Sequence, residues 1–294
     1  MSRTSVAASA LVLPLALLLG ACASPGSDSG SADEPVRIGV VDSGDPYWTT
    51  FTDEAAAEGI DVELVNFTEY EQPNPALTAG ELDLNQFQHI IYLATYNQQS
   101  GEDLVPIGST AIYPLGLYST QYDSVEDIPD GATVAVPNDP SNQARALLVL
   151  QSAGLVELAD GGSIFSTPAD VLDGSKVKVE ALDAAFTATS LPDVAASIVN
   201  NDFLPDAGLT PEDAIATDDP SDPNALPYVN VFAARSEDAD NETYQKLVEI
   251  YQDSDEVLAG VSESSGGTAE FVTTPAADLQ ASLADVQADI AANE

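Results

Sequence analysis

The chain has almost no cysteine, histidine or positive charge. Of its 294 residues, one is cysteine and one is histidine, and 7 basic residues stand against 49 acidic ones. One cysteine excludes an internal disulfide, and one histidine without a cysteine partner cannot form a typical zinc site. At a formal net charge of −42 the chain should not bind nucleic acid, and anionic lipid headgroups should repel it. We therefore expect no metal, no other cofactor and no nucleic-acid partner.

The N-terminus carries the one long apolar run that is not part of a folded body. Arg3 precedes apolar residues 7–19, a run that is too short and too early for a membrane span but typical of a signal-peptide core. The run ends in Leu19-Gly20-Ala21-Cys22. Small residues ahead of the sole cysteine resemble a bacterial lipobox, in which that thiol is diacylglyceryl-modified before cleavage. A simple secretion signal with an incidental cysteine is the alternative.

These features predict how the protein is attached. We expect a signal peptide at 1–21, then a lipid-modified Cys22 at the head of a flexible tether, 22–35, which is rich in Pro, Gly, Ser and Asp. The acyl chains would hold the protein on the extracytoplasmic side of the cell membrane. The remainder, with 44% hydrophobic residues in the whole chain and dispersed acids, is expected to be globular.

Hydrophobic periodicity predicts alternating strands and helices after residue 35. Strands are expected at 36–41, 60–65, 82–84, 133–136, 177–182, 195–199 and 228–234. Helices are expected at 47–58, 87–96, 141–153, 244–258 and 275–290. This alternation favours an α/β protein with parallel sheets flanked by helices.

The two sets of elements predict two lobes with two crossing segments. We expect the first lobe at 36–117, the second at 118–226 and a return to the first at 227–294, with crossings near 115–118 and 227–231. Ligands of such open sheets bind in the crevice at the carboxyl ends of strands.

Several stretches together point to a known family. They are residues 67–77 (FTEYEQPNPAL), 80–89 (GELDLNQFQH) and 131–147 (GATVAVPNDPSNQARAL), with shorter matches at 207–209 and 227–230. In order and spacing they resemble the NlpA/MetQ family of methionine-binding lipoproteins, from about residue 36 to 231. The resemblance implies a type II periplasmic-binding-protein fold. It also implies that the protein delivers methionine to the permease of an ABC importer.

Arg145 is the first candidate for contact with a ligand. It is the only basic residue between Ile38 and Ser175, and we expect it in the first turn of the helix at 141–153. Free N–H groups and the helix dipole favour an anion there, and a guanidinium offers a planar fork for a carboxylate. The alternative is a surface ion pair with a nearby acid. The resemblance implies that Arg145 holds the substrate carboxylate.

An aromatic group forms the second candidate. Phe87, His89 and Tyr92 lie on one short segment, with His89 and Tyr92 on one face if the segment is helical. Such rings could wall a slot for a thioether, because sulfur packs well at aromatic edges. The alternative is that they are only core. The resemblance adds Tyr70 to this group.

Three asparagines complete the predicted site. Asn200 ends a predicted strand, and Asn230 lies at the second crossing. An asparagine both donates and accepts hydrogen bonds, so a pair could satisfy an amino and a carboxylate group; the resemblance supports both. Asn142 is expected either to cap the Arg145 helix, which we favour slightly, or to line the pocket.

Alternatives to methionine transport remain open. Within the same class the ligand could be D-methionine, a dipeptide that contains methionine, or another small amino acid. We do not expect an enzyme, since no nucleophile–base spacing is visible and one histidine leaves only carboxylates for hydrolysis. A surface adhesin that has kept the fold is a third class.

Overall fold

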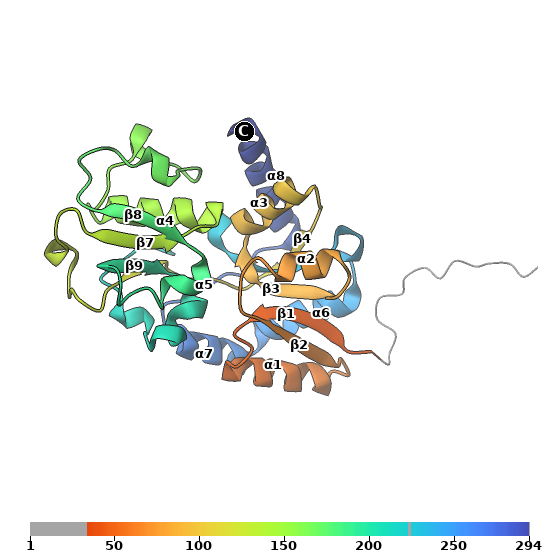
Figure 1. Ribbon diagram of the computed structural model, residues 1–294. Helices are drawn as coiled ribbons and strands as arrows, with labels where there is room; N and C mark the ends of the chain where they lie inside the picture. Colours follow the sequence, from red (N-terminus) through yellow and green to blue (C-terminus); the bar gives the residue numbers. More distant parts are fainter. Residues whose placement is uncertain (1–33, 223–224, 294) are drawn as a thin grey trace, which may run out of the picture.

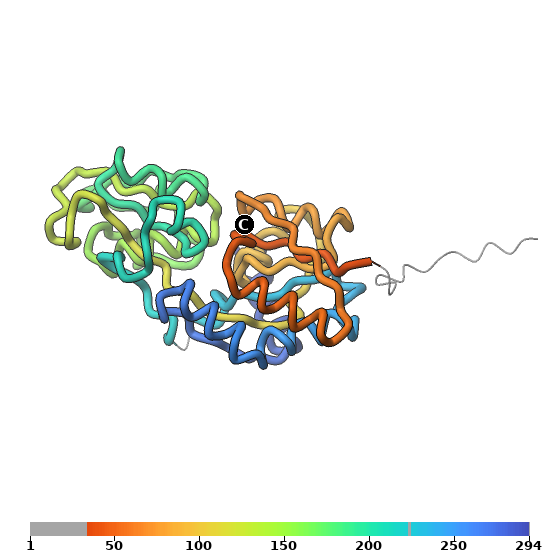
Figure 2. Tube along the Cα trace, turned by 90° about the horizontal axis from the view of Figure 1, so that it is seen from below, coloured from red at the N-terminus to blue at the C-terminus, as the bar shows by residue number. Residues whose placement is uncertain are grey.

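The protein is described here by a computed structural model that covers residues 34–222 and 225–293. Cys22, the expected signal peptide and nearly all of the expected tether lie outside these residues. In the described part the chain forms two α/β lobes that lie side by side, as Figures 1 and 2 show from two directions. Each lobe is organised by a sheet of its own.

The first lobe contains the sheet in which the chain begins and to which it returns. Its strand order is β2-β1-β3-β11-β4. The strands are β1 (Val36–Val41), β2 (Val62–Phe67), β3 (Leu84–His89), β4 (Val105–Ser109) and β11 (Asn230–Ala234). β1 runs parallel to β2 and to β3, whereas β11 is antiparallel to both of its neighbours, β3 and β4. A strand from late in the sequence, β11, therefore lies inside the first sheet, between β3 and β4.

Helices cover both faces of this sheet. They are α1 (Pro46–Ala57), α2 (Pro73–Thr78), α3 (Ile90–Ser100), α6 (Glu242–Asp253), α7 (Asp255–Ser264) and α8 (Ala276–Asn293). On one face Trp48 and Phe51 of α1 pack with Tyr251 of α6 in one core cluster. On the other face Leu279 and Leu283 of α8 belong to a second cluster. Aromatic and branched side chains on both faces explain why the inner strands β1, β3 and β11 are mostly buried, whereas the edge strand β2 is not.

The second lobe repeats the same plan on a smaller scale. Its strand order is β10-β6-β9-β7-β8. The strands are β6 (Gly116–Tyr118), β7 (Thr133–Pro137), β8 (Lys178–Leu182), β9 (Ala196–Val199) and β10 (Ala216–Thr217). The helices include α4 (Pro140–Ser152), α5 (Ala184–Thr187) and the 3₁₀ helix η4 (Asn201–Ala207). β7 is parallel to β8 and β9, while β6 is antiparallel to β9.

Two segments connect the lobes. The chain leaves the first sheet at Ser109 and enters the second at Gly116, and it leaves at Thr217 and returns at Asn230. The short β5 (Ala111–Ile112) of the first connection pairs with β12 (Glu270–Phe271), and the 3₁₀ helix η6 (Leu226–Tyr228) lies in the second. The first connection thus begins a few residues earlier than expected, because residues 116–118 already belong to the second sheet.

The expected helix at 87–96 is partly wrong. Residues 84–89 form β3, whose side chains are all buried, and α3 begins only at Ile90. The polar residues of β3 break the apolar pattern expected of an inner strand. Asn85 and Gln88 form buried hydrogen bonds with Asn74 of α2 and with each other. An inner strand can carry such residues when every amide finds a partner.

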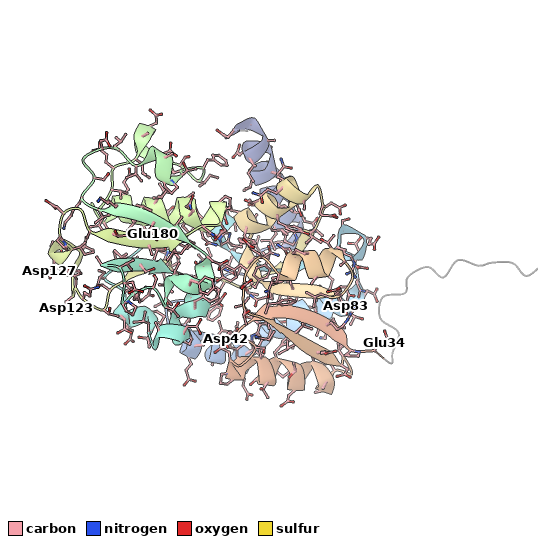
Figure 3. The ribbon with its side chains drawn as sticks, viewed as in Figure 1. Glu34, Asp42, Asp83, Asp123, Asp127 and Glu180 are labelled. Carbon is pink, nitrogen blue, oxygen red and sulfur yellow. The ribbon has the colours of Figure 1, made fainter. Side chains whose placement is uncertain are left out.

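Acidic side chains are spread over the surface of both lobes. Among those labelled in Figure 3, Glu34 and Asp83 belong to the first lobe and Asp123, Asp127 and Glu180 to the second. Within the described residues, no helix has both the length and the apolar composition needed to cross a bilayer.

Candidate ligand-binding site

A small cavity lies between the lobes, and all eight residues singled out from the sequence line it. Those residues are Tyr70, Phe87, His89, Tyr92, Asn142, Arg145, Asn200 and Asn230. Gln88, Asn201 and three residues of the first connection, Tyr113, Pro114 and Leu115, complete the lining. The free space is about 20 Å³, which is room for about one water molecule. The lobes are therefore closed on each other at this point.

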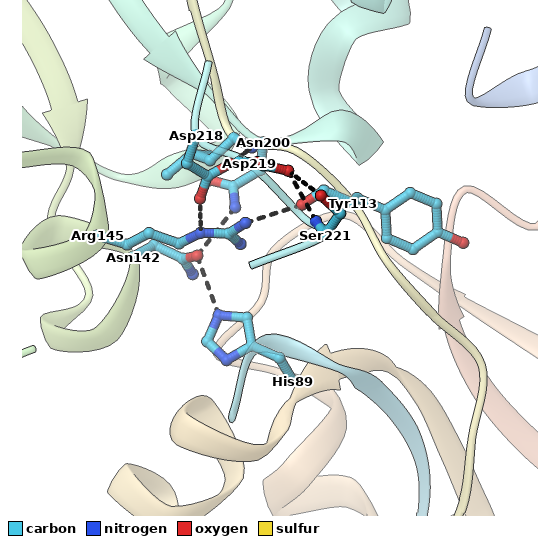
Figure 4. Close-up of polar contacts among 9 residues, drawn as sticks. His89, Tyr113, Asn142, Arg145, Asn200, Asp218, Asp219 and Ser221 are labelled. Atoms are coloured by element: carbon cyan, nitrogen blue, oxygen red, sulfur yellow. Dashed lines mark hydrogen bonds and ion pairs between the residues drawn. The ribbon is translucent and has the colours of Figure 1, made fainter. Parts of the chain in front are cut away.

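Arg145 is buried, and groups from both connecting segments hold its guanidinium. Nε donates to Oδ2 of Asp218 at 2.6 Å, and Nη2 donates to the carbonyl oxygen of Tyr113 at 2.9 Å (Figure 4). The guanidinium carbon lies 4.4 Å from the centre of the Tyr228 ring, a cation–π contact. The other carboxylate oxygen of Asp218 accepts from the backbone N–H of Leu115 at 2.8 Å. Arg145 faces the cavity, but Asp218 and Tyr228 do not line it.

The start of α4 differs from the expectation in two ways. Arg145 is the sixth residue of the helix, so it lies in the second turn, beyond the free N–H groups. The N-cap is Asp139, whose carboxylate accepts from the backbone N–H of Asn142. The slight preference for Asn142 as the cap is therefore wrong. A carboxylate of the protein itself takes the position at the helix N-terminus where an anion is favoured.

A chain of hydrogen bonds runs across the interlobe boundary. His89, at the end of β3 in the first lobe, bonds through Nε2 to Oδ1 of Asn142 at 3.2 Å. Asn200, at the end of β9, donates from Nδ2 to the same oxygen at 3.0 Å (Figure 4). Asn142 donates from Nδ2 to both oxygens of Asp139, at 3.0 and 3.2 Å. Asn142 thus connects the two lobes.

His89 is a neutral hydrogen-bond donor. Its Nδ1 accepts from the backbone N–H of Tyr92 at 3.2 Å, so the ring proton is on Nε2, which donates to Asn142. Burial, followed by the nearby charge of Arg145, lowers the pKa of His89 to about 3. The ring therefore stays uncharged at physiological pH.

Three rings of the first lobe form a triangle on one wall of the cavity. The ring centres of Tyr70, Phe87 and Tyr92 are 5.7 to 6.0 Å apart. Phe203 of η4 in the second lobe approaches Tyr70 at 4.9 Å. Tyr70 and Phe87 belong to a core cluster, with Tyr92 packed against it, so these rings are both core and cavity lining.

A second cavity of about 140 Å³ adjoins the first and shares Phe87, Tyr113, Asn201 and Asn230 with it. Asp42 and Asp45 of the first lobe and Asp202 of the second face it. The hydroxyl of Tyr70 donates to Oδ2 of Asp202 at 2.7 Å, a bond between the lobes. Among the described residues, no group of three or more His, Cys, Asp or Glu side chains is arranged to hold a metal ion.

Burial shifts the pKa of two of these carboxyl groups. It raises the pKa of Asp202 from 3.8 to about 7, with smaller contributions of the same sign from Asp42 and Asp45 and an opposing one from the Tyr70 hydrogen bond. Burial and the neighbouring Asp42 raise the pKa of Asp45 to about 6. The closed lobes therefore bind protons more tightly at this cavity than isolated carboxyl groups would.

Sequence reasoning missed the residues that hold the site residues in place. Asp139 had a local signal, because an aspartate directly before Pro140 is a helix N-cap pattern. Asp218 had none: it is 73 residues from Arg145 and lies where neither a strand nor a helix is expected. Tyr228 likewise reaches Arg145 only through the fold.

Comparison with known proteins identifies the family. The sequence profile of the NlpA lipoprotein family matches residues 36–272, which is further than the stretch recognised from motifs. The D-methionine-binding lipoprotein MetQ of Salmonella typhi is 37% identical over 273 residues, which are 91% of this chain and 97% of that protein.

Two solved structures agree in fold as well as in sequence. A nutrient-binding protein from Burkholderia cenocepacia, solved bound to methionine, is 38% identical with a TM-score of 0.74 and covers 80% of this chain and 99% of its own. The substrate-binding protein of a methionine transporter from Streptococcus pneumoniae is 35% identical with a TM-score of 0.75, covering 81% and 95% respectively. The chain therefore has the two-lobed fold of substrate-binding proteins and belongs to the NlpA lipoprotein family.

Proposed function

We propose that this protein captures methionine between its lobes and delivers it to the permease of an ABC importer. The observation that carries the proposal is the interlobe cavity, where a guanidinium, a set of amides and a triangle of rings converge. These are the three kinds of group that an α-amino acid with an apolar thioether side chain requires. The methionine-binding relatives named above support the same ligand.

Each part of methionine has a matching group in the cavity. Arg145 supplies charged donors for the carboxylate. Oδ1 of Asn200 supplies an acceptor for the ammonium group, and the side-chain amide of Asn230, which lines the same cavity, is a second polar group for it. Tyr70, Phe87 and Tyr92 supply polarisable ring edges for the sulfur.

Entry of the ligand requires the lobes to move. About 20 Å³ of free space cannot hold methionine beside the side chains as they stand. The two connecting segments are the places where the lobes can rotate, as in other hinged binding proteins. We infer an open form that admits the ligand and a closed form that docks on the permease.

Calorimetric titration of the folded body with L-methionine tests the proposal. Micromolar or tighter binding is expected, and Arg145→Ala should raise the dissociation constant at least about a hundredfold, because the ligand carboxylate loses its charged partner. D-methionine is titrated in parallel to measure the stereochemical preference. If neither isomer binds and no methionine derivative co-purifies, as judged by mass spectrometry, the assignment of the ligand is wrong.

The adjoining cavity favours one alternative ligand. Its 140 Å³ next to Phe87 and Asn230 gives a longer ligand room to extend, and its acids suit a cationic end. A dipeptide that contains methionine is therefore the second candidate. Tighter binding of such a dipeptide than of methionine in the same titration would select it.

We also propose the attachment and division of the chain that the sequence predicts. A lipid on Cys22 would anchor the protein on the outer side of the cell membrane, and 22–35 would tether the two lobes. The first lobe division falls before Gly116 rather than at the expected 117/118, because β6 belongs to the second sheet, and the second division is proposed at 226/227. The protein would bind and release its ligand without chemical turnover. Cys22→Ser should free the protein from the membrane fraction; continued membrane attachment would contradict the anchor.

A further inference from the structure

Asp139, the N-cap of α4, does more than cap the N-terminus of the helix. The carboxylate of Asp139 accepts from the backbone N–H of Asn142 at 2.9 Å, from the hydroxyl of Ser141 at 3.0 Å and from Nδ2 of Asn142. Only the first of these contacts is needed for capping. The others tie the Asn142 side chain to the same carboxylate.

The direction of the Asn142 amide follows from this contact. Burial raises the pKa of Asp139, and the hydrogen bonds from Asn142 and Ser141 oppose that shift by favouring the ionised form. The ionised carboxylate offers only acceptors, so Asn142 must turn its NH₂ group toward it. Its oxygen must then point the other way, toward His89 and Asn200. The orientation does not depend on how the amide oxygen and nitrogen are assigned, because the reversed amide would place oxygen against oxygen.

The direction of the Asn200 amide follows in turn. Because Oδ1 of Asn142 is an acceptor, Asn200 must present its NH₂ group to it, and its own Oδ1 points elsewhere. Asn200 is 7% exposed and lines the cavity. Within the described part of the chain its Oδ1 is buried and has no hydrogen-bond partner. A buried acceptor without a partner is costly unless a ligand satisfies it.

We propose that Asp139 is a positioning residue: through Asn142 it fixes the amide of Asn200 so that the cavity presents an acceptor to a cationic donor of the ligand, the ammonium group of an amino acid. This inference rests on the proposed function and adds how the site distinguishes an amino acid from the corresponding acid without the amino group. Asp139 would act without touching the ligand. Arg145, in the second turn of α4, would bind the opposite end.

The lone histidine provides a test that needs no ligand. Since His89 is the only histidine, its two ring nitrogens can be observed by ¹⁵N NMR without ambiguity. In the wild type we expect the neutral Nε2–H tautomer alone, unchanged from pH 8 to pH 5. Because the backbone N–H of Tyr92 keeps the ring proton on Nε2 in either case, the readout is the Nε2–H hydrogen bond to Asn142. In Asp139→Asn both directions of the Asn142 amide become possible, so this bond should weaken, and the Nε2 proton should shift upfield and exchange faster with water. Asparagine is as good an N-cap as aspartate, so the helix is retained.

A pair of ligands tests the consequence for recognition. Methionine and 4-(methylthio)butanoate differ only in the amino group. In Asp139→Asn the dissociation constant of methionine should rise about tenfold, the size expected for a hydrogen bond to a charged group, while that of the analogue changes less than about twofold. Asp183→Asn, which changes another helix N-cap of the second lobe, is the control and should alter neither.

The outcomes separate this inference from the proposed function. If the wild type does not bind methionine but the His89 Nε2–H signal responds to Asp139→Asn, the ligand assignment fails and the positioning role stands. An unchanged Nε2–H signal in Asp139→Asn would overturn the role itself. Equal losses for methionine and its analogue would show that Asp139 only stabilises α4, and would overturn the link to the amino group.

Discussion

The two walls of the interlobe cavity differ in chemistry. The first lobe supplies rings, with Tyr70 from the segment before α2, Phe87 and His89 from the end of β3, and Tyr92 from α3. The second lobe supplies Asn142 and Arg145 from α4 and Asn200 from the end of β9. Apart from the amides of Gln88 and Asn230, the first-lobe wall thus offers polarisable ring surface, whereas the second-lobe wall offers directed hydrogen bonds and a charge.

This difference shows how recognition can be divided. The polar wall addresses the carboxylate and ammonium groups that all α-amino acids share, and the aromatic wall addresses the side chain. Lobe closure is needed to bring both to one ligand, which is why neither wall alone is expected to bind tightly. Changes in one wall should therefore alter a different part of the ligand preference from changes in the other.

The largest effect is expected from removing the counter-charge of the polar wall. In Asp218→Asn the buried guanidinium of Arg145 loses its partly exposed ionic partner at 2.6 Å. It is then less well oriented toward the ligand carboxylate, so methionine affinity should fall about tenfold or more. Affinity for methioninamide, which lacks the carboxylate, should fall much less in calorimetry.

The neighbouring Asp219 provides a matched control. It lies in the same connecting segment but is exposed and bonds to Ser221. Asp219→Asn makes the same change in charge and should leave both affinities unaltered. Equal effects of the two variants would mean that Asp218 acts only through net charge, not through Arg145.

A smaller effect is expected from the aromatic wall. Phe87→Leu keeps an apolar side chain but removes the ring from the triangle with Tyr70 and Tyr92. A sulfur–aromatic contact is worth about 0.3–1.5 kcal/mol, so methionine affinity should fall about two- to tenfold. Norleucine, which replaces sulfur by CH₂, should lose less, and the ratio of the two affinities is the measurement. An unchanged ratio would show that the rings do not recognise sulfur.

The smallest effect concerns the hydrogen bond between Tyr70 and Asp202, which joins the two lobes. Burial raises the pKa of Asp202 from 3.8 to about 7, and Asp42 and Asp45 of the other lobe contribute, so the closed form should hold a proton more tightly than an open form. Protonation therefore favours closure fully below about pH 4, and that contribution is lost as the pH rises from about 4 through 7. Only the part of the shift that the other lobe causes enters the affinity, so methionine affinity should decline by a few fold from pH 5 to pH 8.

Two variants isolate this carboxyl group. Asp202→Asn should reduce the slope of affinity against pH, leaving a remainder from Asp45, whose pKa burial raises to about 6. Asp206→Asn, an exposed residue of the same 3₁₀ helix, should retain the full slope. An affinity that rises with pH in the wild type would contradict the argument.

The outline of the fold could be read from the sequence because it depends on local periodicity. The β-rich run at 36–41 and the capped helix after Pro140 are both found where expected. β3 was misread because its buried amides break the apolar pattern that marks an inner strand. Their hydrogen bonds join residues of different elements, so no window of sequence contains the reason for their burial.

The chemically unusual residues can be recognised from the sequence. A lone arginine among acids, a lone histidine and asparagines at strand ends are visible without coordinates, and family motifs assigned them to a site. How these residues act together depends on the fold. Arg145 meets Asp218 and Asn142 meets His89 because two crossings bring segments 53 to 73 residues apart into contact. Asp139 orients the amide of Asn142, which in turn orients the amide of Asn200. Which atom of an amide donates and which accepts depends on the partners around it in space, not on residue type.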